Sequence, residues 1–170
     1  TLIDKSMSVG TERDLGHEYL TSLEERLSES VRNTTPTGWD IIDEVMDGGL
    51  GAGELGVIVA PAGIGKTWML QVLGANAIKR GKTVVHYSLE LNQTYVGLRY
   101  DTVFSGVTTS NIKFYKDDVQ KKIDTLKGEL YIKYYPTRSA TVQTLNSHLQ
   151  QLLIQGIKPD LVVCDYADIV

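Results

Sequence analysis

The sequence is short of cysteine, of paired histidines and of long apolar runs, and each scarcity excludes a class of protein. Cys164 stands alone, so no disulfide can form within the chain, and a reducing cytoplasm is the expected compartment. No apolar run approaches the ~20 residues that cross a bilayer, and Thr1–Gly10 lacks the basic-then-apolar order of a secretion signal. His17, His86 and His148 do not have metal-ligand spacing. We therefore expect a cytoplasmic protein without membrane contact.

Strong basic charge is missing as well. The 170 residues carry a net charge of −4, with 4 basic and 11 acidic side chains in residues 1–50 and 13 and 10 in residues 51–170. Neither part has the basic footprint of a protein that binds duplex DNA mainly through its phosphates. Any contact with nucleic acid must be narrow, shared among subunits or supplied by other segments.

The most informative stretch that is present is Ala-Pro-Ala-Gly-Ile-Gly-Lys-Thr at residues 60–67. It lies between an apolar run and an amphipathic segment, which is the strand–loop–helix order of a phosphate-binding loop. Gly63 and Gly65 can adopt backbone angles closed to other residues, so successive N–H groups can surround a phosphate chain. Lys66 would reach the terminal phosphates, and the Thr67 hydroxyl would ligate Mg²⁺.

This loop predicts a site for ATP and Mg²⁺. The residues expected to contact the nucleotide are Ala62, Gly63, Ile64, Gly65, Lys66, Thr67 and Trp68. The pattern begins with Ala60, where glycine is usual. The alternative is a glycine-rich turn that carries Gly-Lys-Thr without binding phosphate.

The chain is predicted to have an N-terminal extension, residues 1–35, and a core, residues 36–170. Within the extension, Thr11–Arg32 is predicted to be a helix with a narrow apolar stripe. Such a stripe must cover something apolar, either the chain's own core or a neighbouring copy. The turn-rich segment Asn33–Gly38 marks the break.

The core alternates between strands and helices. Strands are predicted at Gly56–Ala60, Thr83–Leu89, Glu129–Tyr135 and Leu161–Asp165. Helices are predicted at Lys66–Arg80, Tyr95–Ser105, Lys116–Leu126 and Val142–Gln155. Mostly apolar strands separated by helices indicate an α/β fold, with a mostly parallel sheet flanked by helices.

Acidic residues lie at the carboxyl ends of two of these strands, where ligands of an open parallel sheet bind. Glu90 could orient or deprotonate the attacking water, or it could be a surface residue that starts the next helix. Asp165 follows four apolar residues, where a carboxylate is unfavourable unless a metal or donor meets it, so it is predicted to help hold Mg²⁺. Asp168 is a rival for that role. Arg99 is an accessory candidate that either pairs with a carboxylate or contacts phosphate.

Taken together, these motifs resemble the RecA-like ATPase core of DnaB-type hexameric replicative helicases, most closely the T-even-like phage version. The resemblance is carried by Pro36–Asp40, Asp47–Leu50 and Gly53–Leu55, by the loop that starts at Ala60, by Ser88–Leu91 with Arg99 downstream, and by Tyr135–Thr137 and Cys164–Tyr166. It extends over residues 36–170.

The resemblance implies a motor that hydrolyses ATP and moves along single-stranded DNA as a ring. It implies that Glu90 and Lys66 are catalytic and that Thr67 and Asp165 form the metal site. It also implies a hexamer, a primase or helicase loader as partner, a linker helix near the N-terminus, and the cytoplasm of a bacterial or phage-infected cell. In that family the DNA-contacting loops and the arginine finger come later in the sequence. We therefore expect a partial core with an unpaired sheet edge that binds ATP–Mg²⁺ but turns it over poorly.

Other functions are compatible with the same loop. A RecA-like recombinase would form filaments on DNA, and a clock-type regulatory ATPase would use its nucleotide state to control partner binding. Clock-type proteins often carry two adjacent acidic residues where this chain has Glu90 and Leu91. A degenerate binder without turnover is disfavoured because four chemical residues are all present: Lys66, Thr67, Glu90 and Asp165.

Overall fold

The computed structural model describes residues 19–20, 23–28 and 32–165. The chain divides into two compact units, Thr1–Arg32 and Asn33–Val170. No helix in the described ranges is long and apolar enough to span a membrane.

The described helix of the first unit is α2, Leu23–Ser28. The prediction of a continuous helix over 11–32 is wrong at Tyr19 and Leu20, which form a turn, and at Arg32, which is not helical. The other residues of that prediction lie outside the described ones. Leu23 and Leu27 are 57% and 65% exposed, and isolated helices shorter than about 12–15 residues are marginal without burial.

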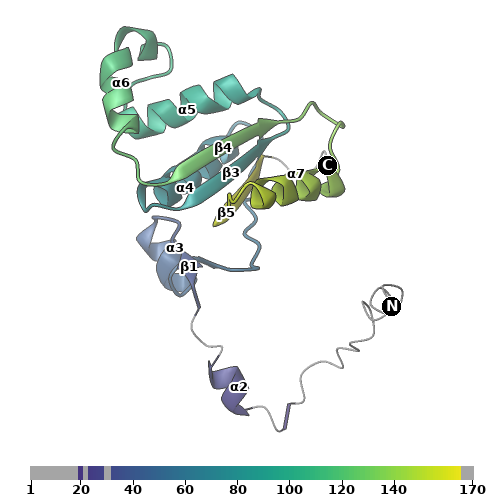
Figure 1. The fold of residues 1–170 in the computed structure, drawn as a ribbon. Helices are drawn as coiled ribbons and strands as arrows, with labels where there is room; N and C mark the ends of the chain where they lie inside the picture. The colour runs from purple at the N-terminus through teal and green to yellow at the C-terminus, as the bar shows by residue number, and fades with distance from the viewer. Residues whose placement is uncertain (1–18, 21–22, 29–31, 166–170) are drawn as a thin grey trace. The chain divides into compact units, whose positions relative to one another are not determined.

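The second unit is built on a parallel three-stranded sheet, drawn in Figure 1. Its centre is β3, Thr83–Ser88, with β4, Glu129–Tyr134, on one side and β5, Leu161–Asp165, on the other. Ser88 lies opposite Tyr134 in one ladder and opposite Asp165 in the other. The predicted parallel α/β architecture is confirmed, and the carboxyl ends of all three strands lie at the same edge of the sheet.

Helices cover both faces of this sheet, as Figure 1 shows. Side chains of β3 alternate between the faces: Val84 packs with α4, Lys66–Lys79, and α5, Gln93–Ser105. Val85 and Tyr87 pack with α7, Val142–Ile154. A short η1, Ile112–Phe114, and α6, Lys116–Ile123, pack beside α5.

The helix starts follow local capping chemistry. The Asn92 side chain accepts a hydrogen bond from Tyr95 N (3.0 Å) and caps α5. The helix therefore begins at Gln93, two residues before the predicted start. Thr141 and Thr144 form a capping box at α7, which begins at the predicted residue. Helix α6 ends at Ile123, three residues before the predicted end.

A small hairpin precedes the phosphate-binding loop and was not predicted. It pairs β1, Thr34–Thr35, with β2, Leu50–Gly51, and encloses α3, Asp40–Val45. Strands of two residues carry no readable alternation, so no sequence pattern predicts them. Nearby, Asn76 Nδ2 on α4 donates to Thr37 O (2.9 Å), which ties this segment to the core.

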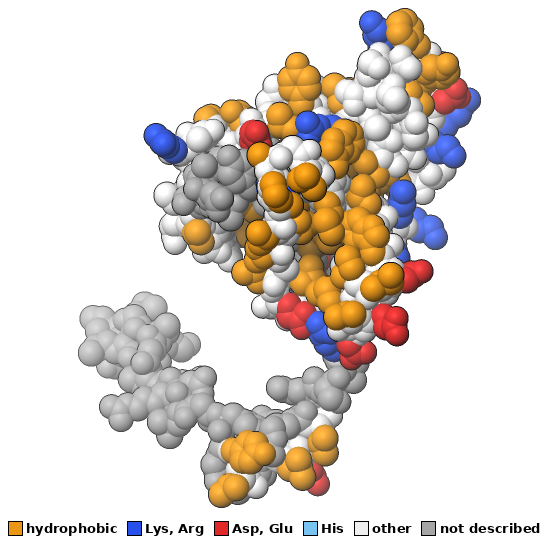
Figure 2. All heavy atoms as spheres, turned by 180° about the vertical axis from the view of Figure 1, so that it is seen from behind, with side chains coloured by type: hydrophobic (Ala, Val, Ile, Leu, Met, Phe, Trp, Pro, Cys, Tyr) orange, Lys and Arg blue, Asp and Glu red, His pale blue; other side chains and the backbone are white. Residues whose placement is uncertain are grey.

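The predicted strand Gly56–Ala60 is wrong: this segment is not a strand and pairs with none of the described strands. Leu55, Val57 and Val59 are 86%, 72% and 88% exposed. The continuous apolar run that predicted a strand is present, but a strand forms only where a neighbour supplies the ladder hydrogen bonds. Figure 2 shows hydrophobic side chains gathered on the rear face of the unit. Among the described strands β5 pairs only with β3, so the expected unpaired sheet edge is present.

Candidate nucleotide-binding site

The loop before α4 has the backbone geometry of a phosphate cradle. Gly65 caps the helix with φ +107° and Gly63 has φ +80°, both in the left-handed region that favours glycine. The Lys66 ammonium folds back onto the loop and donates to Ala60 O (2.7 Å) and Pro61 O (3.2 Å). A cation already lies inside the loop, held by two carbonyl oxygens that phosphate oxygens can replace.

Residues on the outer side of the loop are open to solvent. Ala62 is exposed, and Ile64 is 71% exposed. Trp68 is 39% exposed, and the Arg99 guanidinium lies over its ring, 5.1 Å from the centroid. This cation–π contact between α4 and α5 was not predicted, because the two residues are far apart in sequence. It places Arg99 beside the loop.

Asp165 ends β5 next to the end of β3. Its backbone carbonyl accepts from Leu89 N (2.8 Å), which continues the ladder beyond Ser88. The side chain is 2% exposed, and its Oδ2 atom has no hydrogen-bond partner among the described residues. A buried carboxylate oxygen without a donor is unfavourable by about 1–3 kcal/mol or more. Asp168, the rival candidate, lies outside the described residues.

The electrostatics of Asp165 show which predicted residues surround it. Burial raises the pKa of its carboxyl, and a hydrogen bond from the Thr67 side chain opposes that rise. The Glu90 carboxylate raises this pKa further, whereas the charges of Arg99 and Lys66 lower it. The five side chains that were predicted to carry the chemistry thus lie close enough to interact electrostatically, although they come from four different segments. They are Lys66, Thr67, Glu90, Arg99 and Asp165.

Glu90 is held at the turn after β3. Ser88 Oγ donates to Leu91 O (2.6 Å) and accepts from Leu91 N (3.1 Å), so this hydroxyl closes the turn around the two residues between them. Glu90 itself is exposed. The turn presents its carboxylate at the strand edge that carries Asp165, where it is free to meet a water or ligand.

A buried polar group behind Asp165 was missed by sequence reasoning. His86 lies inside β3, as predicted, but its Nδ1 atom is 2.9 Å from the Tyr100 hydroxyl. Gln71 of α4 is also fully buried. Burial lowers the pKa of His86 to about 4, so its imidazole is neutral at pH 7. No local signal marks this group, since a polar residue in a strand or helix does not identify its partner across the core.

Gly74 makes room for this group, and replacing it tests the packing. A methyl group at this position would collide with the Tyr100 hydroxyl. We expect Gly74→Ala to lower the free energy of unfolding by up to about 2 kcal/mol, because overpacking costs ~1–3 kcal/mol and the gain in helix propensity is only about 1 kcal/mol. The measurement is the free energy of unfolding in urea for the variant and the parent.

The matched control is Gly97→Ala on α5, where the added methyl would meet only Ile132 at 3.9 Å. That variant should be as stable as the parent or more so. Adding Tyr100→Phe to Gly74→Ala should recover part of the loss, because the colliding oxygen is then absent. Equal stability of the two alanine variants would contradict the proposed packing.

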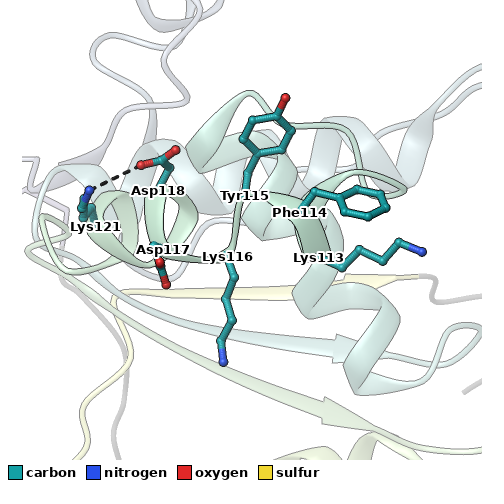
Figure 3. A pocket seen from close by; sticks show the side chains of 7 residues that line it. All are labelled: Lys113, Phe114, Tyr115, Lys116, Asp117, Asp118 and Lys121. Carbon is teal, nitrogen blue, oxygen red and sulfur yellow. Dashed lines mark hydrogen bonds and ion pairs between the residues drawn. The ribbon is translucent and has the colours of Figure 1, made fainter.

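A separate pocket of about 390 Å³ lies at η1 and the start of α6 and is shown in Figure 3. It is lined by Lys113, Phe114, Tyr115, Lys116, Asp117, Asp118 and Lys121. The Lys121 ammonium pairs with Asp118 at 3.4 Å, and the pair is exposed. This pocket shares no residue with the loop or with the strand ends, so it is not part of the nucleotide site.

The residues at the strand edge fit Mg²⁺ bound together with a nucleotide. No cluster of three or more histidine, cysteine or acidic side chains that could hold a metal is found in the part of the chain that the structure describes. Mg²⁺ does not need one, because it is usually held by one or two protein oxygens, water and substrate phosphates. The unpartnered Oδ2 of Asp165 and the neighbouring Thr67 hydroxyl supply such oxygens.

Comparison with known proteins identifies a family. A family model described as the DnaB-like helicase C-terminal domain matches residues 34–170. A DnaB-like replicative helicase of Enterobacteria phage T4 is 25% identical over 179 aligned positions, which cover 99% of this chain and 38% of that protein. The DNA repair protein RadA of Aquifex aeolicus is 32% identical over 95 positions, covering 55% of this chain and 20% of RadA.

Solved structures share the fold. One of them is described as that of a DnaB-like replicative helicase and its interactions with primase, and it superposes with a TM-score of 0.65 at 17% identity. The match covers 96% of this chain and 41% of that one. The chain thus spans about two fifths of the relatives it matches over nearly its whole length.

Proposed function

Because the chain belongs to the family of DnaB-like helicase C-terminal domains, we propose that its core binds ATP with Mg²⁺ as the motor part of a replicative DNA helicase. The observation that carries this proposal is the convergence on Asp165. A lysine, a threonine, a glutamate and an arginine all act on its carboxyl group at the end of a parallel sheet. In such sheets the carboxyl ends of the strands are where ligands bind.

Each residue has a proposed task. The loop amides from Ala62 to Trp68 and the Lys66 ammonium hold the phosphates, and Thr67 with Asp165 holds the metal ion. When bound, Mg²⁺ supplies positive charge that offsets the charge developing on the phosphates. Glu90 orients the attacking water and accepts its proton, a task that commonly contributes about 10²–10⁴-fold in rate.

Arg99 is proposed to keep the Trp68 ring against the helix start and to add positive charge at the rim. The guanidinium already lies over that ring. Because the site described here is built from a single copy, we also propose that the chain alone binds ATP–Mg²⁺ and hydrolyses it slowly. An arginine supplied by a neighbouring subunit typically accounts for about 10³–10⁵ in rate in enzymes of this chemistry.

The proposed assembly is a ring, a hexamer in the full-length protein, that moves on single-stranded DNA in the cytoplasm of a bacterial or phage-infected cell. The segment around α2 is proposed to be the linker helix that contacts the neighbouring copy. Its Leu23 side chain is 57% exposed, which supports this proposal. A primase or a helicase loader is the proposed protein partner.

One observation favours a second candidate. The similarity to RadA extends over 95 positions at 32% identity, higher than the identity to the phage helicase. A recombinase-type ATPase would use the same phosphate loop but assemble as a filament on DNA.

Electron microscopy of the full-length protein with a non-hydrolysable ATP analogue and single-stranded DNA separates these candidates. Closed six-membered rings are expected for the helicase. Helical filaments would transfer the assignment to the recombinase, and monomers would leave a nucleotide-controlled binding protein as the better interpretation.

A further inference from the structure

Arg99 is a partly buried cation whose hydrogen-bond donors are unused. It lies on α5, and its guanidinium is 5.1 Å from the centroid of the Trp68 ring on α4. Among the residues that the structure describes, Arg99 forms no hydrogen bond and no ion pair. The sequence leaves two roles open for this arginine, pairing with a carboxylate or contacting phosphate. The first of these pairings is not found with any described carboxylate.

The missing ion pair is informative because two carboxylates lie nearby. The charges of Glu90 and Arg99 both act on the carboxyl group of Asp165, so these three side chains share one edge of the sheet. Coulombic attraction favours direct contact between a guanidinium and either carboxylate. The Arg99 guanidinium instead lies over the Trp68 ring, a contact at least as favourable as an exposed ion pair. The ring therefore competes successfully for the cation.

The contact with Trp68 leaves the edge of the guanidinium available. A guanidinium that lies over an aromatic ring turns a face toward it, while its five N–H donors stay in its own plane. These donors form a fork that matches two oxygens of a phosphate group. Because no residue within the described ranges accepts from Arg99, the fork is open to an anionic ligand that offers at least two oxygens.

Both partners of the contact are anchored beside the phosphate-binding loop. On α5, Val96 and Tyr100 flank Arg99 and are 0% and 1% exposed. They belong to the core cluster beneath α4 and α5, so they hold the backbone of Arg99 in place. Trp68 stands in the first turn of α4 and directly follows Thr67. The open fork of donors is thus carried by a fixed backbone next to the loop.

We propose that Arg99 binds the terminal phosphate of ATP and that Trp68 is the positioning residue that orients its guanidinium. This rests on the proposed function of the loop as an ATP–Mg²⁺ site. The terminal phosphate is assigned because Mg²⁺ bridges the last two phosphates of ATP, and the charge of Arg99 acts on Asp165, the proposed metal carboxylate. An arginine on this phosphate lets a single copy of the chain distinguish ATP from ADP.

The first test needs no nucleotide. In a Trp39→Phe background Trp68 is the only indole, and its emission should change in Arg99→Met, because the cation over the ring is lost. The matched control is Lys113→Met, which removes an ammonium that lies over the Phe114 ring, 4.8 Å from its centroid, in the separate pocket at η1. The control should leave the emission unchanged. Equal emission of Arg99→Met and the parent would overturn the positioning role of Trp68.

The second test measures, by calorimetry of the whole chain with Mg²⁺, the binding of a non-hydrolysable ATP analogue and of ADP. Arg99→Met should weaken binding of the ATP analogue by about 10–100-fold, the effect of losing a hydrogen bond to a charged group, and should weaken ADP binding much less. Lys113→Met removes the same charge elsewhere and should change neither affinity. Equal weakening for the two nucleotides would overturn the assignment to the terminal phosphate. Arg99→Lys keeps the charge without the planar fork and should show the same selective loss, which keeps the test decisive if Arg99→Met does not fold.

A double-mutant cycle separates positioning by the ring from direct contact of the ring with nucleotide. Trp68→Leu should weaken binding of the ATP analogue by about 3–30-fold, the range of a cation–π contact, and Trp68→Phe should lose less because it keeps an aromatic face. In the Arg99→Met background Trp68→Leu should cause no further loss, because the guanidinium that the ring orients is absent. Losses that simply add would overturn the positioning role.

The proposed function and this inference fail in different ways. If the parent chain binds neither nucleotide, the proposed function fails, and the phosphate contact of Arg99 fails with it. If the parent binds the ATP analogue with Mg²⁺ and Arg99→Met binds it equally well, the role of Arg99 is wrong and the proposed function stands.

Discussion

Replacing Lys66 with alanine is expected to abolish the fluorescence response of Trp68 to ATP–Mg²⁺. The Lys66 ammonium lies within the loop, bound to two carbonyl oxygens, and would exchange them for phosphate oxygens. Hydrogen bonds to charged groups contribute about 1.5–3 kcal/mol each, so losing two weakens binding by about 100-fold or more. The measurement is an ATP titration in a Trp39→Phe background, where Trp68 is the only indole left of the two in the chain.

The control is Lys79→Ala at the other end of the same helix. Lys79 lies over the Phe104 ring, 5.9 Å from its centroid, and about 20 Å along the helix axis from the loop. Its removal should leave the response unchanged. A response that survives in Lys66→Ala would show that the nucleotide does not use this loop.

Acid destabilisation that depends on His86 is the second large effect expected. Burial lowers the pKa of His86 from 6.5 to about 4 in the folded chain. Between those values the unfolded chain binds a proton that the folded chain does not, so stability falls as the pH falls through this window. The full contribution, reached at about pH 4 and below, is roughly 3 kcal/mol.

The measurement is the free energy of unfolding against pH for the parent and for His86→Gln, which keeps a hydrogen-bonding side chain but does not titrate here. The Nδ1 atom of His86 lies 2.9 Å from the Tyr100 hydroxyl. Tyr100 is unchanged in the variant, so the difference between the two curves isolates the histidine. The difference should change by roughly 3 kcal/mol between pH 7 and pH 4. Parallel curves would contradict a buried neutral His86.

The parts of the fold that could be predicted from sequence are those specified locally. The glycine-rich loop, the apolar strands β3, β4 and β5 and their helices follow from short-range patterns, and so does the acidic residue that ends β5. Parallel pairing then brings Glu90 and Asp165 to one edge, because the carboxyl ends of parallel strands share it. This is why the candidate residues meet although more than seventy positions separate them.

The errors come from features that depend on partners distant in sequence. Residues 56–60 have the apolar run of a strand but pair with no described strand. Tyr19 and Leu20 carry the helical period of the predicted stripe but form a turn. The Arg99–Trp68 contact and the His86–Tyr100 pair arise from packing between elements. No periodicity in one segment predicts which residue of another segment will meet it.

The most direct test is a crystal structure of the chain grown with Mg²⁺ and a non-hydrolysable ATP analogue. The account predicts phosphates within the loop from Ala62 to Trp68, Lys66 Nζ released from the Ala60 and Pro61 carbonyls, and Asp165 facing the metal ion. A nucleotide bound elsewhere, or Lys66 still bonded to those carbonyls beside a bound phosphate chain, would contradict it.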